Sequence, residues 1–227
     1  MNDTESRMEA PAQSGISRRR FFGYAGALAG AGLLMSTAGC KKDDDDDGIN
    51  LGSNDVGVLN YAYALEQLEA AFYIRVTQSF YSGITANEQA YFSDIRDHEI
   101  AHREFFKTAL AGNAIQGLTP DFSSVNFNDR TSVLETAKAF EDLGVSAYNG
   151  AGKLLTNPDY LLIAGKIVSV EARHAAAVRD LISNGTFAGI DVVNAQGLDV
   201  SRTPAEVLAI AGTFIKEKLN AGNLPKS

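Results

Sequence analysis

Hydrophobic residues recur every three or four positions through four long segments of the chain. Residues with this spacing lie on one face of an α-helix, and that face packs against a core. The period runs through residues 55–80, 85–112, 131–152 and 157–184, and a shorter helix follows at 203–219. The pattern predicts an all-α protein.

Capping signals mark where these helices begin. A hydroxyl at the N-cap with a Glu three residues later satisfies two backbone N–H groups at a helix start. Such capping boxes are Thr85–Glu88, Ser132–Glu135 and Thr203–Glu206, and Asn157 before Pro158 is a fourth start signal.

The connections between the helices predict their arrangement. Short turns join the first helix to the second and the third to the fourth, so each pair is expected to form an antiparallel hairpin. Residues 112–130 between the pairs are rich in Gly, Pro, Ser and Asn and have no helical period. We therefore expect a four-helix bundle of two hairpins with a long crossover between helices two and three, plus a C-terminal fifth helix.

Two Glu-x-x-His pairs place ionisable groups within the apolar stripes of this bundle. Glu99 and His102 lie in the second helix, Glu171 and His174 lie in the fourth, and the whole sequence contains only three histidines. Residues three apart share a helix face, so each pair can direct a carboxylate and an imidazole at one point. Burying such groups is unfavourable unless something compensates them.

The other two helices each add one inward carboxylate. Glu66 lies in the stripe of the first helix and Glu141 in that of the third. One Glu from each of two helices and a Glu-x-x-His from each of two others form the ligand set of a carboxylate-bridged di-iron or di-manganese site. The predicted metal ligands are Glu66, Glu99, His102, Glu141, Glu171 and His174. The two hairpins also resemble a distant repeat, because the interval from His102 to His174 is close to that from Glu66 to Glu141.

With these residues in place, residues 55–184 resemble the ferritin-like superfamily. The segment 59–73, with the sequence LNYAYALEQLEAAFY, is most similar to the secreted ferritin-like proteins grouped with plant desiccation-related proteins. The resemblance favours Glu66 over Glu69 as the ligand, because Glu66 precedes Tyr73 by seven residues. It also implies that Tyr73 donates to a ligand carboxylate, although a plain core tyrosine fits as well. His98 is expected at the edge of the site or on the surface.

The N-terminal residues 1–40 are typical of an export signal. Arg18 and Arg19 begin a motif that resembles the twin-arginine translocation signal, and an uncharged run rich in Ala, Gly and Leu follows. Cys40 ends a segment that resembles a lipoprotein cleavage box, so lipidation is expected there; an unmodified thiol is the alternative. The protein is then expected in the periplasm or as a lipoprotein at the outer membrane or cell surface, with membrane contact only through the N-terminal lipid or signal.

Residues 41–54, with five consecutive aspartates, are expected to form a disordered acidic tether. Residues 55–184 would form one bundle domain, and residues 185–227 a loop and the fifth helix. The first 39 residues hold 4 of the 20 basic and 3 of the 28 acidic side chains, which leaves a net charge of about −9 afterwards. This charge disfavours nucleic acids as partners and is compatible with metal cations; a homo-oligomer is possible.

The ligand set predicts two Fe ions, or alternatively two Mn ions, with O2 or peroxide as the other partner. The leading hypothesis is a site that oxidises Fe(II) in oxidative or desiccation stress; no catalytic residue is assigned. One alternative is a manganese-catalase-like dismutation of peroxide. Another is a structural or stress protein of the envelope without enzymatic activity, because a fold does not determine activity.

Overall fold

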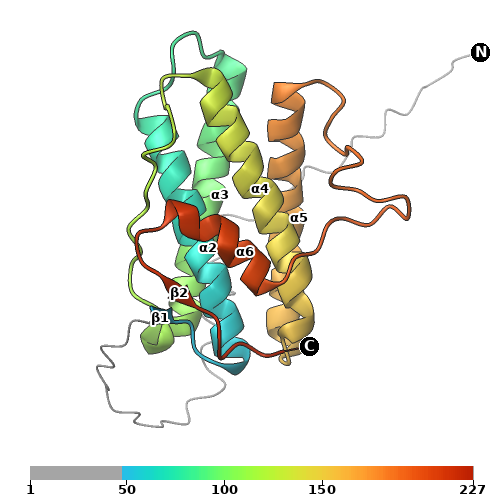
Figure 1. Cartoon of the computed structure of the whole chain (residues 1–227). Coiled ribbons are helices and arrows are strands. Elements are labelled where there is room, and N and C mark those ends of the chain that lie inside the picture. The colour runs from blue at the N-terminus through green and yellow to red at the C-terminus, as the bar shows by residue number, and fades with distance from the viewer. Residues whose placement is uncertain (1–47, 227) are drawn as a thin grey trace, which may run out of the picture. The chain divides into compact units, whose positions relative to one another are not determined.

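The computed structural model describes residues 48–226, and these form four long helices that run side by side (Figure 1). The helices are α2 (Asn54–Gln78), α3 (Ala86–Leu110), α4 (Arg130–Ala151) and α5 (Pro158–Ile182). α2 packs most extensively against α3, and α4 against α5. The predicted two-hairpin bundle with a crossover between α3 and α4 is therefore confirmed.

Three helix starts have the predicted caps. Thr85 and Thr203 each accept from the backbone N–H three residues later and complete their capping boxes, and Asn157 accepts from Asp159 N. The start of α4 differs from the prediction. Asp129 caps this helix by accepting from Ser132 N, so α4 begins at Arg130.

The first helix of the bundle, α2, is buried on almost all sides, with 17 of its 25 residues inaccessible. The crossover covers its outer face and is held there by two buried amides. Asn60 accepts from Ile115 N and donates to Asn113 O, while Gln67 accepts from Leu118 N. A helix with apolar residues on nearly every side needs such cover to be stable in water.

The C-terminal segment is less helical than predicted. The fifth helix, α6 (Pro204–Ala211), crosses the bundle against α4 and continues as a 3₁₀ turn, Gly212–Phe214. The chain then extends, because Ile215 is buried and bridges Pro120 of the crossover. The predicted end at residue 219 is therefore wrong. Residues 185–202 form turns with one isolated bridge, Val193 to Asp199.

Two short parallel strands join the ends of the described chain. β1 (Ile49–Asn50) pairs with β2 (Leu219–Asn220), and Leu51 next to β1 is fully buried. The predicted tether thus ends before Ile49 rather than at Asn54, because this segment finds both a strand partner and a core contact. The export signal, Cys40 and residues 41–47 of the predicted tether lie outside the described residues.

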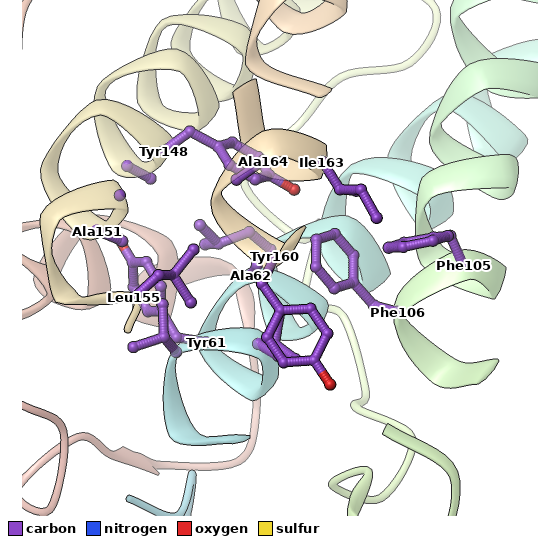
Figure 2. A pocket seen from close by; sticks show the side chains of 15 residues that line it. Tyr61, Ala62, Phe105, Phe106, Tyr148, Ala151, Leu155, Tyr160, Ile163 and Ala164 are labelled. Carbon is purple, nitrogen blue, oxygen red and sulfur yellow. The ribbon is translucent and has the colours of Figure 1, made fainter. Parts of the chain in front are cut away.

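An apolar pocket lies between the four helices towards one end of the bundle (Figure 2). Its walls include Tyr61, Phe106, Tyr148 and Ile163, one from each helix. The free volume is about 20 Å³, which holds one very small molecule. Within residues 48–226, no helix is long and apolar enough to cross a membrane.

Candidate metal centre

The structure brings the six predicted ligand side chains together at the centre of the bundle. Each of the four helices contributes its inward face, and α3 and α5 each present a Glu and a His one turn apart. The carboxylates of Glu66, Glu99, Glu141 and Glu171 have no exposed surface, and His102 and His174 are 6% and 5% exposed. The six groups therefore lie in a shared, water-poor interior.

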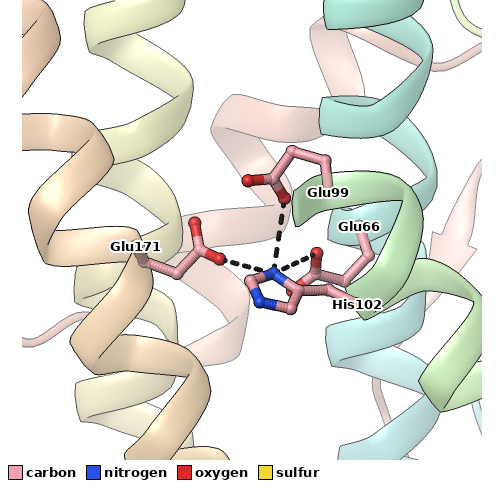
Figure 3. Close-up of side chains that lie close together, drawn as sticks. All are labelled: Glu66, Glu99, His102 and Glu171. Atoms are coloured by element: carbon pink, nitrogen blue, oxygen red, sulfur yellow. Dashed lines mark ion pairs between the residues drawn. The ribbon is translucent and has the colours of Figure 1, made fainter. Parts of the chain in front are cut away.

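The first group of atoms surrounds His102 Nδ1 (Figure 3). This nitrogen lies 2.9 Å from Glu171 Oε1, 3.5 Å from Glu66 Oε2 and 3.7 Å from Glu99 Oε2. Ligand atoms of these four residues all lie within 4.8 Å of one another. This is the spacing of a set of donors that could hold one metal ion.

A second group surrounds His174 Nδ1 in the same way. It lies 2.9 Å from Glu99 Oε1, 3.4 Å from Glu141 Oε2 and 3.9 Å from Glu171 Oε2. Glu99 and Glu171 thus direct one oxygen to each histidine. These two carboxylates belong to both groups and would be shared if each group held one ion.

The hydrogen bonding of the cluster fits metal binding better than it fits a closed polar core. The two Nδ1 atoms, both oxygens of Glu99 and of Glu171, and Oε2 of Glu66 and of Glu141 are buried without a hydrogen-bond partner. Buried polar groups are almost always satisfied, so eight converging unsatisfied atoms need an explanation. A pair of divalent cations would satisfy all of them, and carboxylate with imidazole suits Fe(II) or Mn(II).

Two tyrosines hold the outer carboxylates in a crossed arrangement. Tyr73 on α2 donates to Glu141 Oε1 at 2.5 Å, and Tyr148 on α4 donates to Glu66 Oε1. Each tyrosine follows the glutamate of its own helix by seven residues but bonds to that of the other. Hydrogen bonds of this kind orient metal ligands and tune their basicity. The donor role expected for Tyr73 is what the structure shows.

Sequence reasoning missed Tyr148. Its signal is the repeat itself, because Tyr148 follows Tyr73 at the same interval that separates Glu141 from Glu66. Residues at equivalent positions of two related hairpins are expected to have equivalent contacts, so the repeat could have identified this second donor.

His98 contacts the site from its edge. Its Nδ1 lies 2.9 Å from His174 Nε2, and the two rings are nearly parallel and meet edge to edge, with centroids 5.1 Å apart and an 8° interplanar angle. If His174 Nδ1 binds a metal ion, Nε2 keeps its hydrogen and donates it to His98. His98 is itself exposed, so it links a predicted ligand to the surface of α3.

Replacing His98 with Ala is expected to weaken binding of the ion next to His174 by about 10–100-fold, because partners that orient a ligating imidazole typically have effects of this size. A titration with Mn(II) measures the change, and Glu135→Ala, at an exposed position on α4, is the control. Equal affinities in the two variants would contradict a role for the His98 contact.

Electrostatics show how the cluster balances its charge without metal. Burial raises the pKa of Glu66 to about 7 and that of Glu171 well above its usual range. Burial disfavours the charged form of both histidines, but the carboxylates that face them have the larger effect. They raise the pKa of His174 to about 11 and raise the pKa of His102 well above its usual range. Burial also opposes the charge of Glu99, yet the two imidazoles beside it lower its pKa. The metal-free site therefore holds protons where metal would bind.

Metal affinity is accordingly expected to rise steeply with pH. His102 and His174 are protonated at neutral pH because their pKa values are raised, and ligands must lose these protons to bind metal. Each displaced proton contributes about tenfold per pH unit, so lowering the pH from about 7 to about 6 should weaken binding of each ion about tenfold, and of the pair together about 100-fold. Titrations at the two pH values measure this, and an affinity independent of pH would contradict it.

A fifth carboxylate, Glu69, is also buried beside the cluster, with Oε2 unpaired. Burial, and after it the charges of Glu171 and Glu99, raise the pKa of Glu69 well above its usual range. Sequence reasoning left Glu69 out of the ligand set. Because α2 is buried on nearly all sides, its apolar pattern does not show which carboxylates face inward.

Comparisons with known proteins agree with this geometry. The family model of the ferritin-like domain matches residues 54–184, which is more than half of the chain and spans α2 to α5. A comparison with curated proteins finds no match. The bundle, the crossover and the matched family model lead to one conclusion: the chain belongs to the family of ferritin-like domains.

Proposed function

We propose that this protein binds two iron ions between its four helices and uses them to oxidise Fe(II) with O2 or peroxide. The observation that carries the proposal is the pair of four-residue groups that share Glu99 and Glu171. Shared carboxylates hold two ions close together, as two-electron chemistry at one site requires. Two bound Fe(II) ions would supply two electrons, which with two protons reduce one H2O2 to two water molecules.

The protein's own residues would keep the ligands in place and the surroundings dry. Tyr73 and Tyr148 hold Glu141 and Glu66 in fixed orientations through their hydroxyl groups. The apolar pocket has Tyr148 in its wall, and the same residue contacts the cluster. A pocket with room for one very small molecule favours O2 or peroxide over an organic substrate.

Fe(II) oxidation tests this function directly. Protein loaded with two Fe(II) per chain without oxygen is mixed with limiting H2O2, and the Fe(III) absorbance is followed in time. We expect two Fe(II) oxidised per H2O2, at a rate well above that of free Fe(II). A variant with Glu99→Gln and Glu171→Gln, which loses both shared carboxylates, should show only the free rate.

An unaccelerated rate in the loaded wild-type protein would contradict the enzymatic role. Oxygen release from peroxide after loading with Mn(II), but not with Fe(II), would instead favour dismutation by a manganese centre. The ligand types present accommodate either metal.

We also propose that the protein acts in the cell envelope, in defence against oxidative or desiccation stress. The support is the sequence of residues 1–47: the arginines Arg18 and Arg19, the uncharged run, and Cys40 before the acidic tether. Twin-arginine export carries folded proteins, which would allow metal loading before export.

Replacing Cys40 with Ser is expected to move the protein from the membrane fraction to the soluble fraction, because it removes the atom that would carry the lipid. Fractionation followed by immunoblotting measures this, with the unchanged chain as reference. A Cys40→Ser protein that stays in the membrane fraction would contradict the lipid anchor.

A further inference from the structure

Glu69 is a buried acid that the six-ligand set does not use. It lies on α2 one turn after Glu66, is 3% exposed, and its Oε2 has no hydrogen-bond partner. A carboxylate in this condition is unfavourable unless a cation or a donor compensates it. A purely structural role leaves its burial without a reason.

The repeat of the two hairpins shows how the chain makes room for this side chain. The interval that relates Glu66 to Glu141 also relates Glu69 to Gly144. A Cβ atom at position 144 would lie only 2.9 Å from Glu69 Oε1, closer than real Cβ contacts. The acid on α2 therefore occupies the space that a side chain on α4 would otherwise fill.

The same position shows where the Glu69 carboxylate points. The Cβ site of Gly144 lies 3.6 Å from Glu171 Oε2, so both carboxylates border one small volume. Glu171 Oε2 is the oxygen near His174, whereas Oε1 is the one near His102. Glu69 thus lies close to Glu171, one of the two carboxylates shared by the two groups.

The charges around Glu69 add to the argument. Its strongest electrostatic neighbours are four carboxylates of the predicted ligand set: Glu171, Glu99, Glu66 and Glu141. A fifth carboxylate among four others is repelled by all of them in a low-dielectric interior. Two divalent cations at the centre of the cluster reverse the sign of this interaction.

We propose that Glu69 is a seventh protein ligand of the metal centre, which binds one of the two ions beside the shared carboxylate Glu171. The inference rests on the proposed dinuclear centre and adds an asymmetry to it. Gly144 holds the equivalent position on α4 and has no donor side chain, so only one of the two ions gains this ligand. The two ions therefore have different protein surroundings, although the hairpins that hold them are related by a repeat.

Metal titration of the full chain tests the proposal. Mn(II) is added to the metal-free wild type, to Glu69→Gln and to Gly144→Ala, with heat release and the Mn(II) EPR spectrum as readouts. Glu135→Gln on the surface of α4 is the control. We expect both Glu69→Gln and Gly144→Ala to lower the binding affinity for one of the two ions by about tenfold or more. Both should also change the EPR signal of the coupled Mn(II) pair.

A second readout separates a ligand from a residue that only stabilises the fold. Burial, and after it the neighbouring carboxylates, disfavour the charged form of Glu69, and a neutral glutamine does not carry this cost, so the metal-free variant should melt at a higher temperature than metal-free wild type. A higher melting temperature together with weaker metal binding is the signature of a ligand. Gly144→Ala leaves the Glu69 side chain in the protein but displaces its carboxylate. This variant therefore tests the position of the carboxylate separately from its presence.

Two results would overturn the proposal in different ways. If wild type binds two Mn(II) ions and both variants bind them with unchanged affinity, Glu69 is not a ligand and the dinuclear centre stands. If wild type binds no ion, the proposed dinuclear centre fails and the role of Glu69 fails with it.

Discussion

Replacing either shared carboxylate, Glu99 or Glu171, with glutamine is expected to remove both metal ions together. Each of these residues directs one oxygen to His102 and the other to His174, so one substitution takes a donor from both groups. An amide also cannot neutralise a cation. We expect metal content to fall from about two ions per chain to less than about a tenth of that value.

The outer carboxylates provide the matched comparison. Glu66 belongs only to the first group and Glu141 only to the second. Glu66→Gln and Glu141→Gln should therefore each lose one ion and keep the other, whereas exposed Glu135→Gln should keep both. Loss of a single ion from Glu99→Gln would contradict its bridging position.

Removing the metal with a chelator is expected to lower the melting temperature substantially. A ligand present at about 100 times its Kd stabilises the folded state by about 2.7 kcal/mol per site. For a domain of this size that corresponds to a shift of about 5–10 °C for each ion. The loss is expected because the metal-free cluster leaves buried carboxylates facing one another.

The variant with Glu99→Gln and Glu171→Gln is the control for chelation. It has no bridging donors, so its melting temperature should not change when a chelator is added. A wild-type melting temperature that is equally insensitive would contradict metal stabilisation and favour a purely structural bundle.

The bundle could be predicted from sequence because its signals are local. Apolar positions with helical period, the capping box at Thr85 and the Asn157-Pro158 start each depend on a few neighbouring residues. The Glu-x-x-His pairs also lie within one turn, so their convergence followed from the helix geometry. The resemblance then added the choice of Glu66 over Glu69.

The features that the sequence did not show depend on distant contacts. β1 and β2 pair Ile49 with Leu219, and no local pattern marks two-residue strands so far apart. The early end of α6 follows from the bridge between Ile215 and Pro120 of the crossover. Both details depend on which segments meet in the folded chain.

Within the site, the missed residues have a related cause. Tyr148 bonds to the carboxylate of another helix, and Glu69 is accommodated by Gly144 on α4. The helical period of the sequence does not reveal these two contacts. In each, the partner residue lies on another helix, and α2 is buried on nearly all sides, so its apolar pattern does not define one inward face. Only the constant interval between equivalent positions of the two hairpins carried part of this information.

The most direct test of the central claim is the metal content of the full chain, purified without chelator and measured by plasma mass spectrometry. We predict about two iron or manganese ions per chain, with none in the variant that carries Glu99→Gln and Glu171→Gln. A folded wild-type protein that contains no metal and takes up neither Fe(II) nor Mn(II) on reloading would contradict the dinuclear centre.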